Sequence, residues 1–427
     1  MFPNPQDALP LPASPDLEQY RKLAKDLVKA CHAGTIAAWA DRWMASLPAG
    51  SDRKTIDRAA MDVEEFATRT LTRAARHCLL ADAQFVLARS HCFTSWSDFA
   101  AHLEALTHGG TDTAAFEAAA EAIVRGDETM LQQLLLQNPA LIRAHSAREH
   151  GATLLHYVSA NGVENYRQKS PPNAARITQL LLTAGADVEA EANVYGGGCT
   201  ALGLVATSTP PREADVQIPV MQVLLDHGAQ IEHPNLAGNG ADAVYACLAN
   251  GCPEAAQYLA ERGARVGLVG AAGIGRLDVV QQFVDAADAS RREMAFRYAA
   301  GYGQQEIVRF LLDRGVPVDA HSGDGETALF YAVLGGHIEV VRLLLEHGAR
   351  PGTQNQHGDV TGVAIWKAGH GGQPDLSIKI LEALFAAGGK APDRHPPVNE
   401  KVDAFLTSHG SAVDPKRYWK GEEPRPV

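Results

Sequence analysis

The sequence lacks the cysteine patterns and the long apolar runs that mark several protein classes. It has 6 cysteines in 427 residues, and none forms a Cys-x-x-Cys pair, so we expect neither a zinc ribbon, nor a redox motif, nor a disulfide scaffold. The cysteines are instead expected to be buried thiols in a reducing compartment. No run of 18 or more apolar residues occurs, so no membrane-spanning helix is expected. These absences favour a cytoplasmic protein without a membrane partner.

Positive charge is also scarce. Lys and Arg number 38 against 50 Asp and Glu, which gives a net charge of −12. Binding to nucleic acid needs clustered Lys and Arg, so we expect no nucleic-acid partner. An acidic balance suits a basic partner, but this excess is modest for the length of the chain.

Common catalytic and cofactor motifs are missing as well. The sequence has no Gly-x-Ser-x-Gly and no His-Glu-x-x-His, so it predicts no hydrolase elbow, no metal site and no cofactor. The glycine strings at 271–275 and 299–306 lie between helical patterns, without the preceding strand of a nucleotide-binding loop. Three of the 17 histidines, His156, His227 and His347, fall at helix starts or ends, where we expect structural roles.

A repeat of 33 residues predicts the architecture. Residues 327–359 contain an apolar helix pattern, two glycines, a second apolar helix and His-Gly-Ala, and residues 294–326 follow the same order. Weaker copies end at Gly185, Gly228 and Gly263. One helix pair cannot bury both of its faces, whereas stacked pairs can, so the stability becomes a sum over neighbouring pairs.

The repeated unit resembles the ankyrin repeat. One copy keeps the positions typical of that family at Gly325, Thr327, Leu329, Ala332, Gly336, His337, Leu344, Gly348 and Ala349. A second copy keeps them at Thr153, Leu155, His156, Gly162, Gly185, Ala186, Asp187 and Val188. The phrase at 79–106 is similar to a helical region that precedes ankyrin arrays in bacterial proteins. The resemblance implies an all-α ankyrin-repeat solenoid with a helical N-terminal capping domain.

The repeat pattern departs from the family in three places. The copy at 268–290 is short and lacks the terminal Gly-Ala, and two copies carry insertions. Insertions in repeat proteins form loops that often lie on the binding side. The predicted organisation is a proline-rich, disordered lead (1–15), a helical domain (16–110), the ankyrin array (111–390) with insertions at 164–177 and 207–219, and a terminal half-repeat with a tail (391–427).

Repeat geometry also predicts a binding surface. In ankyrin arrays the turn tips and the last exposed residues of each first helix line a concave face. Mapped onto the repeat, these positions are Glu149, His150, Asn161, Tyr195, Cys199, Asn250, Tyr302, Asp324, Glu326, His357, Asp359 and Lys367. They are polar, acidic or aromatic, and Tyr and His side chains bind partners at a low entropic cost. The string YGGGC (195–199) is the most unusual tip, because its glycines allow close approach of a ligand.

Three functions fit this surface. The first is a binding scaffold that recognises a protein or peptide partner through the concave face. The second is an enzyme with a small-molecule pocket, in which His150, Glu149, Asp324 or Glu326 would act as acid or base. The third is a protein of the immunity type that binds one cognate surface. A solvated groove of mixed residues is the alternative to all three.

Overall fold

The computed structural model describes residues 4–12, 14–47, 53–72, 78–108, 110–233, 242–355 and 358–417. The chain divides into two compact units, residues 1–243 with 250–255 and residues 244–249 with 256–427. Within the described residues, none of the helices is both long and apolar enough to cross a membrane.

The first unit begins with a helical region. Its elements are η1 (Pro5–Asp7), α1 (Leu17–Ala33), α2 (Ile36–Ser46), α3 (Arg53–Leu71), α4 (Leu80–Ser90) and α5 (Trp96–Thr107). Gly34 ends α1 with a φ of 66°, and Ser95 caps α5 by accepting a bond of 3.2 Å from the Asp98 amide. Leu27, Trp39 and Phe99 are fully buried between these helices.

The lead segment is folded where the structure describes it, although its composition predicts disorder. Ala8 and Leu9 are buried, and the Leu9 amide donates to the Ser90 carbonyl at 2.8 Å. The Leu9 carbonyl in turn lies 2.9 Å from Nδ1 of the buried His91. Two apolar side chains and two backbone bonds therefore hold this proline-rich stretch on the helical region, an effect that composition does not reveal.

The expectation of six free thiols is wrong for one pair. Cys31, near the end of α1, forms a disulfide with Cys78, which follows α3, and their Cα atoms lie 5.8 Å apart. The two residues are 47 positions apart, so no local spacing marks the pair in the sequence. Since disulfides persist in oxidising compartments, the cysteines no longer support a reducing one.

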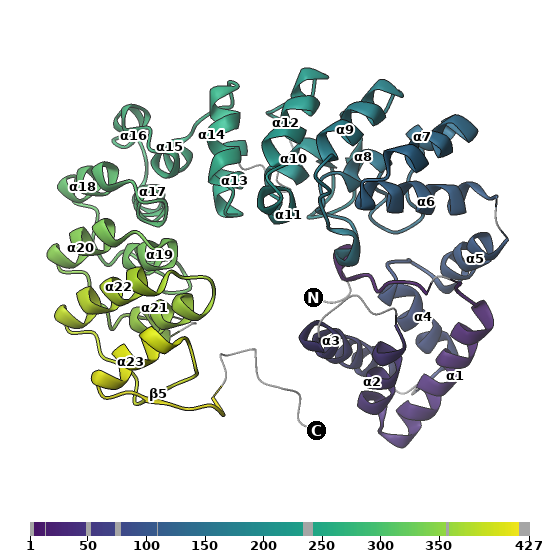
Figure 1. The fold of residues 1–427 in the computed structure, drawn as a ribbon, viewed down its shortest axis with the longest axis horizontal. Helices are drawn as coiled ribbons and strands as arrows, with labels where there is room; N and C mark the ends of the chain where they lie inside the picture. The colour runs from purple at the N-terminus through teal and green to yellow at the C-terminus, as the bar shows by residue number, and fades with distance from the viewer. Residues whose placement is uncertain are drawn as a thin grey trace. The chain divides into compact units, whose positions relative to one another are not determined.

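Helix pairs follow in the first unit, with each pair stacked beside the next (Figure 1). The elements are α6 (Asp112–Arg125), α7 (Glu128–Gln137), η2 (Pro139–Arg143), α8 (Leu154–Tyr157), η3 (Asn165–Arg167), α9 (Ala174–Thr183), α10 (Ala201–Ala206), α11 (Thr209–Glu213) and α12 (Gln217–Asp226). First helices pack on first helices and second on second, as in the contacts of α6 with α8 and of α9 with α12. The insertion at 164–177 contains η3, and α11 forms within the insertion at 207–219.

The second unit repeats the same plan. Its elements are α13 (Ala243–Ala249), α14 (Pro253–Glu261), α15 (Leu268–Ile274), α16 (Leu277–Phe283), α17 (Ala289–Gly301), α18 (Gln305–Asp313), α19 (Ala328–Gly335), α20 (Ile338–Glu346), α21 (Val360–Gly369), α22 (Pro374–Ala386) and α23 (Glu400–Ser408). Figure 1 shows α17 to α22 as successive pairs. The final helix α23 packs on α22, and its Val402 and Leu406 side chains are buried.

The pair α19 and α20 shows why the sequence folds in this way. The Thr327 hydroxyl caps α19 by accepting from the Phe330 amide at 3.3 Å. Gly336 and Gly348 end the two helices with φ values of 77° and 87°, a conformation that favours glycine. Val340 and Leu344 on α20 are buried against the neighbouring helices. The apolar pattern of each helix therefore faces the next pair.

Short strands connect the repeats. An antiparallel hairpin joins β1 (Glu191–Ala192) to β2 (Cys199–Thr200), with Glu191 opposite Thr200 and Ala192 opposite Cys199. A second hairpin joins β3 (Gln354–Asn355) to β4 (Gly358–Asp359), and β5 (Arg394–His395) pairs in parallel with β6 (Ala412–Val413). His156 links α8 to the first hairpin, because its Nδ1 lies 2.8 Å from the Thr153 hydroxyl and its Nε2 lies 3.2 Å from the Cys199 carbonyl. This is the structural role expected for His156.

Candidate functional site

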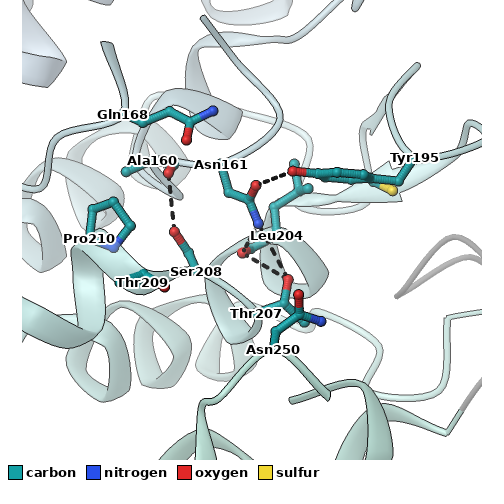
Figure 2. Close-up of a pocket in the computed structure, with 11 residues that line it drawn as sticks. Ala160, Asn161, Gln168, Tyr195, Leu204, Thr207, Ser208, Thr209, Pro210 and Asn250 are labelled. Carbon is teal, nitrogen blue, oxygen red and sulfur yellow. Dashed lines mark hydrogen bonds between the residues drawn. The ribbon is translucent and has the colours of Figure 1, made fainter. Parts of the chain in front are cut away.

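A cavity of about 290 Å³ lies in the first unit, beside the residues that follow the C-terminal ends of α8 and α10 (Figure 2). We call it the Asn161 pocket. It is lined by Ala160, Asn161, Gln168, Tyr195, Cys199, Leu204, Thr207, Ser208, Thr209, Pro210 and Asn250. Both insertions and the tip of the first hairpin contribute to these walls.

A relay of hydrogen bonds fixes the centre of the pocket. The Tyr195 hydroxyl donates to Oδ1 of Asn161 at 2.6 Å (Figure 2). Nδ2 of Asn161 donates to the Leu204 carbonyl at 3.1 Å and lies 3.4 Å from the Thr207 hydroxyl. Both the oxygen and the nitrogen of the Asn161 side-chain amide are therefore hydrogen-bonded. Through these bonds Asn161 holds the Tyr195 side chain in place. The Tyr195 ring remains half exposed and forms a wall.

The backbone around Tyr195 is unusual. Tyr195 has a φ of 52°, and the three glycines that follow have φ values of 104°, 98° and 73°. Ala160, on the opposite side of the relay, also has a positive φ of 45°. A Cβ added at Gly197 would meet only the Asn193 side chain at 3.5 Å, so conformation rather than crowding requires glycine there. Two non-glycine residues in sparsely populated backbone regions at one pocket are typical of functional sites.

The insertions build the remaining walls. The Ser208 hydroxyl donates to the Ala160 carbonyl at 3.1 Å, which ties the second insertion to the preceding repeat. The buried Gln217 side chain donates to the Ser208 carbonyl at 3.1 Å. From the first insertion, the Gln168 side chain donates to the Val163 carbonyl at 2.7 Å. These bonds hold the pocket open by fixing the loops that surround it.

The chemistry of the Asn161 pocket is neutral and polar. Its lining contains amides, hydroxyls, one thiol and apolar groups but no charged side chain. Burial raises the pKa of the Cys199 thiol to about 11, so this cysteine is not a ready nucleophile. The volume is at the lower end for sites that enclose a small molecule or cofactor. The pocket therefore suits one polar or aromatic side chain with its adjoining backbone.

A network of buried charges lies elsewhere in the first unit. Arg148 and Arg167 both pair with Glu117 and with Glu164, and Nη1 of Arg167 lies 2.7 Å from Oε2 of Glu117. The Glu164 side chain is fully buried, and Nε2 of the buried His150 lies 3.8 Å from it. Glu164 and Arg167 belong to the first insertion. That insertion therefore contributes to this network as well as to the pocket.

The same network joins the helical region to the repeats. Nη1 of Arg148 donates to the His91 carbonyl at 3.0 Å, and Nε2 of His102 lies 3.8 Å from Oε1 of Glu117. Burial opposes ionisation of Glu164, but Arg148 and Arg167 outweigh it and hold its pKa well below the usual value. Burial also lowers the pKa of His102 to about 4. The carboxylates and guanidinium groups are thus charged and the histidine is neutral at pH 7.

A comparison of the sequence with models of known protein families identifies the same repeated helix pairs as the structure. A family model for ankyrin repeats, in three copies, matches residues 268–355, which run from α15 to β3. The chain contains ankyrin repeats. A search of curated proteins finds no match to it. Ankyrin repeats imply protein partners, and the array is a protein-interaction scaffold in this general sense.

The ankyrin repeats of the second unit carry a row of tyrosines on their first helices. The Tyr298 ring lies 5.3 Å from the Tyr245 ring and 6.3 Å from the Tyr331 ring, between ring centres. The Tyr331 hydroxyl donates to Glu326 at 2.7 Å, and the Tyr302 hydroxyl donates to the Leu248 carbonyl. All four rings are partly exposed, so the row offers aromatic faces whose hydroxyls are already held.

The structure brings some of the predicted site residues together and separates others. The Asn161 pocket contains four of them, namely Asn161, Tyr195, Cys199 and Asn250. Tyr302 lies in the tyrosine row, and Glu326 accepts a hydrogen bond from Tyr331 of that row. Lys367 borders a different cavity. Asp359 caps α21 by accepting from the Gly362 amide at 2.8 Å, and Asp324 is exposed. His357 lies outside the described residues.

The residues considered for acid–base chemistry do not meet in one pocket. Glu149 pairs with Arg89, and its amide donates to the Cys92 carbonyl at 2.9 Å. His150 is fully buried and accepts from the Ala152 amide at 3.0 Å. Asp324 and Glu326 belong to the other unit. In the described parts of the chain, no group of three His, Cys, Asp or Glu side chains is placed to hold a metal ion.

A serine, a histidine and an aspartate do meet near the end of the chain. Nδ1 of His395 lies 2.7 Å from the Ser411 hydroxyl, and its Nε2 lies 3.2 Å from Oδ1 of Asp403. Ser411 is only 2% exposed, so a substrate cannot reach the hydroxyl for nucleophilic attack. Asp403 also accepts from the Val398 amide at 3.0 Å. We interpret the group as a structural cluster of hydrogen bonds that fixes β5 and β6 against α23.

Sequence reasoning missed seven of the eleven residues that line the pocket and, apart from His150, the charge network. Gln168 and Thr207 to Pro210 come from the two insertions, and the position of these insertions in the sequence was the signal for this part of the pocket. Glu117 offered a second signal, because it is an acidic residue on the buried side of an otherwise alanine-rich helix. Nothing in the sequence shows that Glu164 faces Arg148.

Proposed function

We propose that this ankyrin-repeat protein binds a polypeptide partner and that one side chain of the partner enters the Asn161 pocket. The observation that carries the proposal is the convergence of both insertions and the glycine-rich hairpin tip on this single cavity. A repeat array that only needed to be stable would not require any of these three departures from the repeat. Insertions of this kind often lie on the binding side of repeat proteins.

The chemistry of the pocket supports a neutral partner group. Tyr195 offers a half-exposed ring face, and its hydroxyl is held by Asn161 and by the side chain of Gln6. Tyrosines are enriched among the residues that dominate binding energy, and a ring held by a fixed amide loses little entropy on binding. A polar or aromatic side chain would stack on this ring while its backbone reaches the surrounding amides and hydroxyls.

The tyrosine row supports contact with the same class of partner in the second unit. Tyr298 and Tyr331 present ring faces, and Glu326 adds one carboxylate beside them. Aromatic faces next to a carboxylate suit a partner that carries Arg or Lys. This agrees with the acidic balance of the whole chain.

A peptide selection tests the proposal. Peptides from a displayed random library are enriched on the full chain, and their affinities are then measured for Asn161→Ala and Tyr195→Ala. Tyr258→Ala is the matched control, because Tyr258 lies on the second helix α14. We expect both pocket variants to weaken binding by about tenfold or more, as for a buried anchor, while the control stays within about twofold. Equal affinities for wild type and both pocket variants would contradict the proposal.

A further inference from the structure

The second unit contains a smaller cavity that the proposed function does not use. It has a volume of about 170 Å³ and lies between the turn that follows α19 and the turn that joins α21 to α22. Its polar border consists of Lys367, Gln373, Ser377 and the backbone of Gly371 and Gly372. Apolar side chains form the remaining wall.

Lys367 provides the positive charge of this cavity. Its side chain is partly buried and makes no hydrogen bond or ion pair with any of the described residues. Its backbone carbonyl accepts from the Gly372 amide at 2.9 Å, which folds the glycine turn over the end of α21. An ammonium group without a carboxylate partner, on a residue that lines a cavity, is suited to an anionic ligand.

The N-terminus of α22 faces the same turn. This helix is 13 residues long, and its N-cap residue Gln373 makes no capping bond from its side chain. Pro374 has no amide hydrogen, so the first amides that need an acceptor are those of Asp375 and Leu376. Uncapped amides and the positive end of the helix dipole together favour an anion.

Ser377 is a second, independent indication of a ligand. It is only 6% exposed, and its hydroxyl has no hydrogen-bond partner among the described residues. The hydroxyl points toward the glycine turn, because a Cβ built on Gly372 would lie 3.0 Å from Oγ of Ser377. Ser377 lines the cavity, so this hydroxyl can donate to an acceptor that enters it.

Asp375, the acidic residue in the first turn of α22, does not repel an anion in the cavity. Asp375 is exposed, and its Oδ1 lies 2.7 Å from Nζ of Lys401 on the side of α23. Lys401 therefore neutralises this carboxylate outside the cavity. The cavity itself is bordered by one positive charge and by no negative charge.

We propose that Lys367, Ser377 and the N-terminus of α22 form a binding site for a phosphate group. An ammonium, a hydroxyl and backbone amides approach the cavity from α21, α22 and the turn between them. A phosphate carries more negative charge and more acceptor oxygens than a carboxylate, so it can use more of these donors at once. The phosphate would belong to a phosphorylated side chain of a partner or to a free small phosphate.

Titration of the full chain distinguishes these sources. Inorganic phosphate, a short neutral peptide with one phosphoserine and the same peptide with glutamate are titrated separately, with calorimetry as the readout. The site predicts that both phosphate probes bind more tightly than the glutamate peptide. Tighter binding of the phosphopeptide than of inorganic phosphate assigns the site to a partner side chain, and the reverse order assigns it to a free phosphate.

Three variants test the residues. K367Q is expected to weaken phosphate binding by about tenfold or more and S377A by about threefold to tenfold, since bonds to a charged group exceed neutral ones. K379Q removes the same charge from the exposed face of α22 and is expected to change the affinity by less than about twofold. Melting curves check that each variant is folded.

Absence of phosphate binding to wild type, or equal affinity for wild type, K367Q and S377A, overturns the proposal. Neither result affects the Asn161 pocket, which lies in the other unit.

Discussion

At the scale of single residues, the charges around Glu164 show how an insertion becomes part of a core. Glu164 is fully buried, and two guanidinium groups compensate the cost of removing its charge from water. Its Oε2 has no hydrogen-bond partner among the described residues. Because a buried ion pair depends on every member, loss of one partner leaves the others uncompensated. The network therefore specifies how the first insertion packs more than it adds net stability.

Replacement of one network partner is predicted to destabilise the first unit strongly. Arg148→Met leaves Glu164 buried beside a single guanidinium, and removing one partner of a buried pair costs about 3–5 kcal/mol in the free energy of unfolding. Arg176→Met is the matched control, because Arg176 pairs with Glu128 at 2.9 Å but its side chain is 78% exposed. Its cost should be about 0–1 kcal/mol. Urea unfolding of the three proteins measures both values, and equal midpoints would contradict the argument.

At the scale of helices, the sequence predicts most of the fold correctly. The apolar spacing and the terminal glycines of residues 327–359 predict α19 and α20. The order of the pairs follows from the 33-residue repeat. What the sequence does not reveal is the set of contacts made over long separations. The disulfide, the folding of residues 4–12 on the helical region and the pairing of Glu164 with Arg148 all depend on tertiary packing.

Close packing between neighbouring helix pairs is predicted to depend on Gly335. A Cβ at this position would lie 2.4 Å from the Gly301 carbonyl oxygen, so Gly335→Ala forces α19 away from the end of α17. Overpacking of this kind costs about 1–3 kcal/mol. At Gly352 a Cβ would meet nothing within 4 Å, so Gly352→Ala should change the stability by less than about 0.5 kcal/mol. Thermal unfolding followed by circular dichroism compares the two, and a stable Gly335→Ala protein would refute the packing argument.

The disulfide is predicted to stabilise the helical region by restricting its unfolded state. A bridge between residues 47 positions apart contributes about 4 kcal/mol in the loop-entropy description. The Cys31→Ser/Cys78→Ser protein should therefore unfold at a lower denaturant concentration than the oxidised wild type. Treatment with a reductant should lower the wild-type midpoint to that of the variant and leave the variant unchanged. Mass spectrometry after alkylation under non-reducing conditions provides the direct check, since two alkylated thiols at these positions would exclude the bridge.

At the scale of the whole molecule, the candidate site illustrates which features a repeat pattern can locate. Mapping residues onto the repeat identified Asn161, Tyr195, Cys199 and Asn250, because each occupies the end of a helix or a hairpin tip. The same mapping placed Glu149 and His150 on a surface, whereas both pack toward the helical region. The repeat pattern predicts where a residue lies within its helix pair, but it does not predict whether another part of the chain packs over that residue. A neighbouring domain or an insertion decides which positions remain exposed.

The two units are predicted to respond differently to acid, because buried histidines are concentrated in the first. Burial lowers the pKa of His91 to about 3 and the pKa of His102 and His156 to about 4 each. In the unfolded chain these rings titrate near pH 6.5, so the unfolded state takes up protons first as the pH falls. Their stabilisation is complete above about pH 6.5 and is lost progressively toward pH 4, at on the order of 1 kcal/mol per pH unit for each histidine.

Unfolding curves at pH 7.5 and pH 5 measure this effect. The tryptophans Trp39 and Trp43 report on the first unit, where both are buried. The midpoint of their fluorescence change in urea should fall at pH 5, and His102→Leu should reduce the fall by about a third, since it removes one of three titrating rings. His32→Gln, which changes an exposed histidine on α1, is the matched control. A midpoint that is the same at both pH values would show that these rings are protonated in the folded chain, which would contradict their burial away from solvent.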